Sequence, residues 1–244
     1  MRILHVNDSD EIIGGVEVYL SNLVNLQREN AQIVEILYSK SEQDRAGIIT
    51  LLSRIYNPIA LVRMIKKIKE FKPDIIHFHS ILYYISPSVM HAAKLLNVPS
   101  IISIHDYSIV CPNSYFIDQH GIACKQGFGY QCLTRKCVPY NKKIKYWILR
   151  IYRTIKLLVH RSIIKNNADH ILSPSDNLSK WLQTNLGVNP LTVYLFTELK
   201  AQITPIITEN NLLYVGRVEE GKGIDCLLHA LKIVKEKFSD VRLV

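Results

Sequence analysis

Two stretches decide the fold: PDIIHFHS at residues 73–80 and PSIISIHDYS at residues 99–108. Each is a short run of mostly apolar residues whose last positions turn polar. A short apolar run without strict polar alternation is typical of a strand that is buried on both faces. Because such strands belong to parallel sheets covered by helices, both stretches predict central strands of an α/β protein.

The same rhythm of short apolar runs and longer segments of helical period continues along the chain. The expected strands are 2–7, 32–38, 74–79, 100–105, 170–173, 192–196, 212–216 and 241–244. The expected helices are 16–28, 58–71, 87–96, 142–167, 176–186 and 223–238. Ser175 before one helix and Pro58 in the first turn of another fit the chemistry of helix starts. This alternation predicts a doubly wound parallel sheet.

Two segments interrupt this rhythm. Residues 106–140 form a long connection that holds four of the five cysteines. Residues 197–211 are polar, contain Pro205 and are interpreted as a hinge between domains. The predicted domains are therefore residues 1–196, a complete Rossmann-like domain, and residues 212–244, the first β-α-β of a second one. Because three elements cannot bury a doubly wound sheet, this second domain is expected to be incomplete.

The composition suits a folded protein, since 48% of the 244 residues are hydrophobic. No apolar run approaches the roughly 18–20 residues that span a bilayer, and the start, MRILHVND, does not resemble a secretory signal. A cytoplasmic location is therefore expected. The net charge is +9, and a cluster of Lys and Arg without acids lies between residues 141 and 168. Nucleic acid and an anionic membrane are both candidate partners for such a charge.

Gly14 and Gly15 follow the first expected strand. Because glycine has no Cβ, the pair lets a ligand come close to the backbone at a helix N-terminus. In an open α/β sheet, ligands lie beyond the carboxyl ends of the strands, which is where this pair falls. The alternative is a simple tight turn, and the pattern is not the G-x-G-x-x-G dinucleotide fingerprint.

Polar side chains lie at the ends of the two expected strands at residues 74–79 and 100–105. His77 and His79 lie near the end of one, and His105 and Asp106 end the other. His105 is the preferred functional residue, because histidines within a strand are more often hydrogen-bonded core groups. His77 and His79 share a face of their strand, but no further ligand is evident, so no metal site is predicted.

Cys111, Cys124, Cys132 and Cys137 all fall in the long connection. Four cysteines could hold a tetrahedral Zn²⁺, although their spacing contains no C-x₂-C knuckle. The alternative is a set of free thiols that pack the loop, since cytosolic thiols normally stay reduced. Cys226 falls in a helix and is expected in the core.

The segment KKIKYWILRIYRTIKLLVHRSIIK, residues 142–165, is cationic and amphipathic. Arg150, Arg153 and Lys156 lie between apolar residues at helical spacing, which makes them candidates for docking on an anionic membrane. The alternative is a crossover helix with one solvated basic face. No nucleic-acid-binding module is recognisable, so nucleic acid is not expected as a partner.

Near the C-terminus, LLYVGRVEEGKG at residues 212–223 runs from a strand into a helix. Arg217 and Lys222 flank this turn, and two cations at a helix N-terminus suit a diphosphate. The turn is not a P-loop, since Lys222 is followed by Gly223.

Five motifs, in order, resemble those of family 4 glycosyltransferases. They are Gly14-Gly15-Val16-Glu17, P-D-I-I-H-F-H, I-H-D-Y followed by Cys-Pro, L-S-P-S-D at residues 172–176, and V-G-R-V-E-E-G-K-G. The resemblance extends from residue 1 to the end of the chain. It implies a GT-B architecture with two Rossmann-like domains. It also implies transfer of a hexose from a nucleotide-sugar with retention of configuration, without a required metal or other cofactor.

The resemblance also implies roles for the site residues. Gly14 and Gly15 would lie beside the donor phosphates and the incoming acceptor, and His105 would lie near the transferred sugar as the catalytic residue. Arg217 and Lys222 would hold the leaving diphosphate. The expected partners are then a nucleotide-diphosphate sugar as donor and a glycan or lipid-linked acceptor, in surface polysaccharide synthesis at the inner membrane face.

The chain departs from the family pattern in two places. The family's E-x₇-E element, expected downstream of Lys222, does not occur before Val244, and LFTE at residues 195–198 stands where the family often has Pro-Asn-Gly. The chain is therefore expected to be a truncated enzyme with a complete N-terminal domain. The alternatives are a non-catalytic acceptor-binding or membrane-docking protein, and a binding protein stabilised by a metal on the four loop cysteines.

Overall fold

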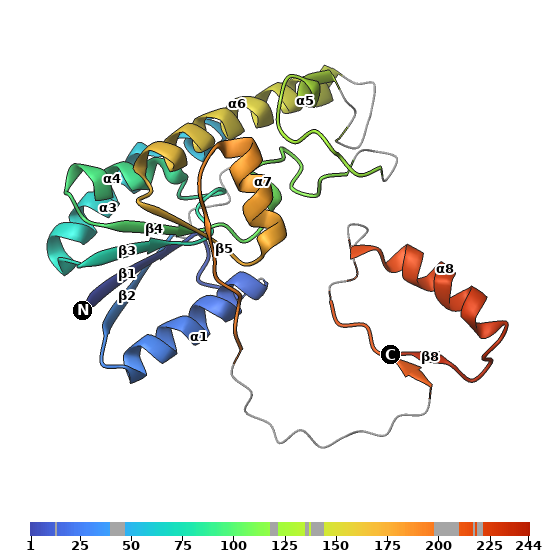
Figure 1. Ribbon diagram of the computed structural model, residues 1–244. Helices are drawn as coiled ribbons and strands as arrows, with labels where there is room; N and C mark the ends of the chain where they lie inside the picture. Colours follow the sequence, from blue (N-terminus) through green and yellow to red (C-terminus); the bar gives the residue numbers. More distant parts are fainter. Residues whose placement is uncertain are drawn as a thin grey trace. The chain divides into compact units, whose positions relative to one another are not determined.

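The computed structural model describes residues 1–12, 14–39, 47–117, 122–134, 137, 144–197, 210–216, 218 and 222–244. The chain divides into two compact units, Met1–Glu198 and Leu199–Val244, each of which is described by itself (Figure 1). The predicted hinge at residues 197–211 lies mostly outside the described residues, and the predicted domain boundaries remain predictions.

The first unit is built on a six-stranded sheet with the order β2-β1-β3-β4-β5-β6. Its strands are β1 (Arg2–Asn7), β2 (Ile33–Tyr38), β3 (Ile75–Phe78), β4 (Ser100–Ser103), β5 (His170–Ser173) and β6 (Leu191–Thr192). Every neighbouring pair is parallel. The predicted α/β class, with a doubly wound parallel sheet, is confirmed. The strand order reverses between β1 and β3, and ligands of such sheets bind beyond the strand ends at this reversal.

Helices cover both faces of this sheet. They are α1 (Gly15–Glu29), α2 (Ile48–Ile55), α3 (Pro58–Phe71), α4 (Met90–Leu95), α5 (Gln131–Thr134), α6 (Ile144–Asn167) and α7 (Asp176–Leu186), with 3₁₀ turns η2 at Pro87–Val89 and η3 at Tyr107–Ile109. Figure 1 shows α1 on one side of the sheet and α3, α4 and α6 on the other. The sequence predicted neither α2 nor α5, because both helices are too short for their apolar residues to show a helical period.

Alternate residues of β1 face opposite layers of the molecule. Leu4 and Val6 belong to the large core that also contains residues of α3, α4 and α6. Ile3 packs in a smaller cluster with Leu20 of α1. Because side chains alternate along a strand, His5 lies on the same face as Ile3, toward α1.

Side-chain caps explain where two helices begin. At α3, Asn57 Oδ1 accepts a hydrogen bond from the N–H of Ala60 (3.0 Å), and Pro58 occupies the first turn. At α7, Ser175 Oγ accepts a hydrogen bond from the N–H of Leu178 (3.2 Å). The roles of Pro58 and Ser175 agree with the prediction from the sequence.

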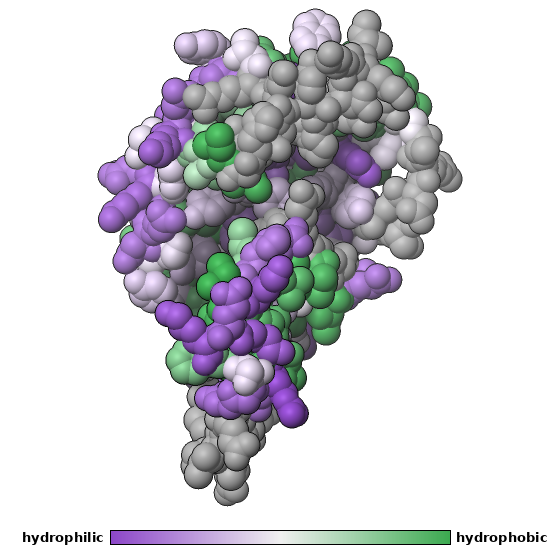
Figure 2. All heavy atoms as spheres, turned by 90° about the vertical axis from the view of Figure 1, so that its right-hand side faces the viewer, coloured by the Kyte–Doolittle hydropathy of each residue, from purple (hydrophilic) through white to green (hydrophobic). Residues whose placement is uncertain are grey.

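The second unit is a β-α-β element. The strands β7 (Asn211–Leu212) and β8 (Arg242–Leu243) pair in parallel, and α8 (Ile224–Lys235) lies between them in the chain. Figure 2 shows hydrophobic side chains at the surface of the protein beside hydrophilic ones. Cys226 of α8 is exposed, so the expectation that it lies in a core is wrong. The reason is that the described residues of this unit form one thin β-α-β layer, in which large side chains such as Ile233 remain 66% exposed.

Candidate functional site

The carboxyl ends of β1 and β3 meet where the strand order reverses. Asn7, the buried last residue of β1, donates from Nδ2 to the carbonyl oxygen of Ser9 (2.8 Å). Its Oδ1 accepts from the N–H of Ser80, just after β3 (3.1 Å). One side chain therefore holds the starts of two loops together at the edge where a ligand is expected.

Asp8 follows Asn7 and fixes the loop after β3. Its carboxylate accepts hydrogen bonds from three consecutive N–H groups, those of Tyr83 (2.8 Å), Tyr84 (3.0 Å) and Ile85 (2.7 Å). Burial raises the pKa of Asp8 from 3.8 to about 6, and the three backbone donors oppose that rise. Asp8 thus acts as a positioning residue for this loop.

Helix α1 starts at this same edge, with Gly14 in an extended conformation before Gly15. Glu17 Oε2 accepts a hydrogen bond from the N–H of Gly14 (2.9 Å). A helix N-terminus presents unpaired N–H groups and partial positive charge, both of which favour anions. A Cβ added at Gly15 would meet no side chain of the described residues within 4 Å, and neither glycine has a positive φ. The space over the helix start is therefore open to a ligand.

His105 lies two residues beyond β4, beside α1. Its ring stacks on His79 at 5.8 Å between centroids and meets Tyr19 of α1 edge-on at 5.7 Å. Both ring nitrogens are buried and have no hydrogen-bond partner among the described residues. Burial lowers the pKa of His105, while the nearby acids Asp106 and Glu17 act against the shift. A neutral imidazole of this kind can donate one hydrogen bond to a ligand and accept another.

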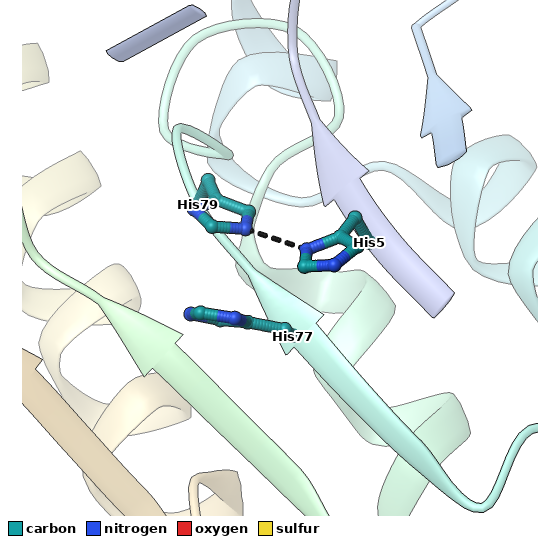
Figure 3. A group of neighbouring side chains, drawn as sticks. All are labelled: His5, His77 and His79. Atoms are coloured by element: carbon teal, nitrogen blue, oxygen red, sulfur yellow. Dashed lines mark hydrogen bonds between the residues drawn. The ribbon is translucent and has the colours of Figure 1, made fainter. Parts of the chain in front are cut away.

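Three more histidines, His5, His77 and His79, form a buried group that we call the histidine cluster (Figure 3). His5 and His77 are register partners on β1 and β3. His5 Nδ1 lies 2.9 Å from His79 Nε2, the hydrogen bond drawn in Figure 3. Two further nitrogens are held: Gln27 Oε1 lies 2.7 Å from His5 Nε2, and Ser103 Oγ lies 2.8 Å from His77 Nε2. His79 Nδ1 is buried and has no hydrogen-bond partner among the described residues.

The histidine cluster is uncharged at neutral pH. Burial lowers the pKa of His5 to about 4 and that of His77 to about 3, and it lowers the pKa of His79 well below 6.5. Neutral imidazole is the form that binds metals, and the three ligand atoms lie within 4.8 Å of one another. The sequence revealed no further ligand for His77 and His79, whereas the pairing of β1 with β3 supplies His5. In the part of the chain that the structure describes, no other group of three or more ligating side chains is so closely spaced.

The four loop cysteines border one small cavity, together with Arg150 and Arg153. These cysteines are Cys111, Cys124, Cys132 and Cys137. Burial raises the pKa of the Cys111 thiol, which makes the thiolate form needed for metal binding less favourable. Among the described residues, no three of these sulfurs lie close enough together to bind one metal ion. The structure therefore presents thiols that pack a loop.

The candidate membrane-docking cations lie on α6 and are partly buried. Arg150 Nη2 donates to the carbonyl oxygen of Leu133. Lys156 Nζ lies 5.1 Å from the centroid of the Tyr83 ring, and burial lowers its pKa to about 8. Arg153 lines a cavity with Lys156. Their role in docking stays a prediction, and their side chains already have contacts within the protein.

The predicted diphosphate cations belong to the second unit. Arg217 lies outside the described residues, and Lys222 is exposed just before α8. Gly223 begins this helix with a φ of 71°. The two units are described separately, so the assignment of Arg217 and Lys222 to a diphosphate stays a prediction.

Sequence reasoning missed three residues at this edge of the sheet. Asn7 ends the first strand and Asp8 follows it, so the rule that polar strand ends face the site could have found both. His5 lies within a strand and carries no such signal. Only the neighbouring position of β1 and β3 brings His5 beside His77.

Comparison with known proteins agrees with this architecture. A family model described as Glycosyltransferase Family 4 matches residues 13–195. No curated protein matches the chain. The structure of Anabaena Alr3699/HepE in complex with UDP is 13% identical, with a TM-score of 0.53, over 95% of this chain and 57% of that one. A ugt transferase from Siraitia grosvenorii in complex with UDP is 14% identical, with a TM-score of 0.40, over 93% of this chain and 52% of that one.

The chain thus spans little more than half the length of these solved structures. At such low identity, the likeness to the Anabaena protein concerns the fold, and it agrees with the expected GT-B type of α/β architecture. The family model covers well over half of the chain. The chain therefore belongs to Glycosyltransferase Family 4.

Proposed function

We propose that this chain acts as a glycosyltransferase that moves a hexose, with retention of configuration, from a nucleotide-sugar to a glycan or lipid-linked acceptor. The observation that carries the proposal is His105, a neutral imidazole just beyond β4 whose two ring nitrogens have no hydrogen-bond partner among the described residues. Family membership supports the reaction class. UDP in the complex of the Anabaena protein supports a nucleotide donor.

The chemistry of each residue suits one part of this transfer. Positive charge develops at the anomeric carbon and negative charge on the leaving diphosphate. Because the pKa of His105 is lowered, its ring can hydrogen-bond a sugar hydroxyl without adding positive charge there. The N–H groups at the start of α1, over which Gly14 and Gly15 leave space, would bind phosphate oxygens. Arg217 and Lys222 would offset the charge of the leaving group.

Purified chain incubated with radiolabelled UDP-hexoses tests this proposal through transfer to acceptor or release of free sugar. His105→Ala should slow the reaction about ten- to hundredfold, the effect of losing one or two hydrogen bonds in the transition state. The matched control is His170→Ala, which removes an exposed histidine from β5. Equal rates for His105→Ala and the unchanged chain, or no binding of UDP at all, would contradict the proposal.

The wider role that we propose is surface polysaccharide synthesis by a cytoplasmic protein attached to the inner membrane face. A surface of exposed apolar side chains supports the attachment. On α2 and α6 they are Ile48 (74% exposed), Ile49 (80%), Leu52 (59%), Trp147 (59%), Ile148 (59%) and Leu158 (52%). Apolar residues on helices beside cations are typical of proteins that lie on an anionic bilayer.

The same surface supports a second candidate function, membrane docking without catalysis. Among the described helices, none is by itself long and apolar enough to cross a bilayer, although α2 and α3, which meet at 50°, pass that test as a pair. Replacing Ile48 and Ile49 by Ser should release the chain from anionic vesicles and leave folding intact, because both side chains are exposed. Unchanged co-sedimentation with vesicles would remove this surface from consideration.

A further inference from the structure

A cavity of about 370 Å³, which we call the basic cavity, lies between α2, α6 and the loops after β3 and β4. Its wall includes three cations and three phenols: Arg54, Arg153, Lys156, Tyr83, Tyr115 and Tyr152. None of the described residues that line it is acidic. The basic cavity is therefore suited to an anion.

The basic cavity lies at the same end of the sheet as His105. Tyr83 belongs to the loop after β3 that Asp8 holds by three hydrogen bonds. Ser108, another residue of the wall, lies three positions beyond His105 in the loop after β4. A ligand in the basic cavity would thus lie at the carboxyl end of the strands, as the transferred sugar would.

Two of the cations rest on aromatic rings, which holds them in place. Lys156 Nζ lies 5.1 Å from the centroid of Tyr83, and the Arg54 guanidinium lies 5.6 Å from that of Tyr84. Arg54 Nε is buried and has no hydrogen-bond partner among the described residues. Because buried donors normally have partners, this nitrogen is available to an acceptor such as a phosphate oxygen.

Apolar side chains also contribute to the wall of the basic cavity. Leu51 lines it and is 42% exposed, and its carbonyl oxygen accepts a hydrogen bond from the Tyr152 hydroxyl (2.9 Å). Ile148 and Ile155 lie four positions before and three positions after Tyr152, so they share its face of α6. Both are exposed, by 59% and 47%. A hydrocarbon chain next to an anionic group would match this combination of surfaces.

We infer that the basic cavity binds the phosphate groups of a lipid-linked acceptor, whose hydrocarbon chain lies on the exposed apolar residues of α2 and α6. The inference rests on the proposed function for the identity of the ligand as an acceptor. Arg54 and Arg153 would form paired hydrogen bonds to phosphate oxygens, and Lys156 would add a point charge. The sugar of the acceptor would then extend toward His105.

Co-sedimentation with three kinds of phosphatidylcholine vesicles tests the inference: neutral vesicles, vesicles doped with an isoprenoid diphosphate, and vesicles doped with phosphatidylglycerol to the same net charge. The unchanged chain should bind the diphosphate vesicles about tenfold more tightly than those with phosphatidylglycerol. Lys156→Met keeps an unbranched side chain over Tyr83 and removes the charge, so it should abolish this preference. Lys156→Arg should preserve it. Lys180→Ala, an exposed lysine on α7, serves as the matched control.

Arg54→Gln provides an independent variant and should lower the preference about tenfold, the effect of a lost hydrogen bond to a charged group. Inorganic diphosphate in excess should compete only weakly if the hydrocarbon chain contributes, whereas full competition would show a site for free phosphate and overturn the lipid assignment. Equal binding to both anionic vesicles, or a preference that survives Lys156→Met and Arg54→Gln, would overturn the inference. The vesicle assay contains no nucleotide-sugar, so its results are independent of donor binding and catalysis.

Discussion

Gly15 starts α1 with a backbone conformation that any residue can adopt, and no side chain of the described residues lies within 4 Å of the position where its Cβ would be. Neither conformation nor packing within the described residues explains a glycine there. The proposed reason is the close approach of a phosphate to the helix start. The alternative, a glycine that serves a tight turn, predicts the opposite effect of a substitution.

Gly15→Ala should therefore leave the melting temperature unchanged or raise it slightly, because alanine favours a helix over glycine. The affinity for UDP-sugars should fall by about tenfold or more, since the added methyl group occupies the space of the ligand. Differential scanning fluorimetry and isothermal titration calorimetry measure the two effects. Val18→Ala on the exposed side of α1 is the control. A lower melting temperature with unchanged affinity would favour the tight turn.

At the scale of the elements, hydrophobic period and helix caps predicted most of the first unit. Both α3 and α7 have the predicted bounds, Pro58–Phe71 and Asp176–Leu186. The expected helix at residues 87–96 instead begins with a 3₁₀ turn, and the expected strand at 192–196 shortens to Leu191–Thr192. β6 lies at the edge of the sheet and pairs only with β5, so pairing ends where the chain leaves that neighbour.

The contribution of the Ser175 cap of α7 to stability can be measured. Ser175→Ala should lower the free energy of unfolding by about 1 kcal/mol, because the N–H of Leu178 loses its acceptor. Urea denaturation followed by circular dichroism is the measurement. Ser162→Ala, on an exposed position of α6, should change stability by less than about 0.5 kcal/mol. Equal effects of the two substitutions would exclude a capping role for Ser175.

At the scale of the whole molecule, buried titratable groups link stability to pH. The pKa is lowered to about 4 for His5 and His160 and to about 3 for His77, so these groups stay neutral when folded. The unfolded chain binds their protons near pH 6.5, so their contribution is complete above that pH and is lost as pH falls toward 4. Asp8, whose pKa is raised to about 6, acts in the opposite direction between about pH 6 and 4.

The destabilising effect of several buried histidines at low pH exceeds the stabilising effect of the single Asp8. The free energy of unfolding should therefore decrease as pH falls from 7 to 5. Each buried histidine contributes a slope of up to about 1.4 kcal/mol per pH unit. His77→Asn should make the dependence shallower, whereas His170→Asn, at an exposed position, should not. Urea titrations across this pH range measure the slopes. Parallel curves for the His77→Asn variant and the unchanged chain would contradict a neutral, buried His77.

The strands, the helices and the polar strand ends follow from local patterns, because hydrophobic period and caps involve residues only a few positions apart. Those patterns were enough to predict the α/β class and to choose Gly14, Gly15 and His105. The contacts that organise the strand ends around these residues are long-range. Asp8 binds N–H groups more than 70 positions away, and His5 meets His79 across 74 positions, because β1 and β3 are neighbours in the sheet. No local period encodes which strands become neighbours, so the histidine cluster and the basic cavity emerge only when the sheet has formed.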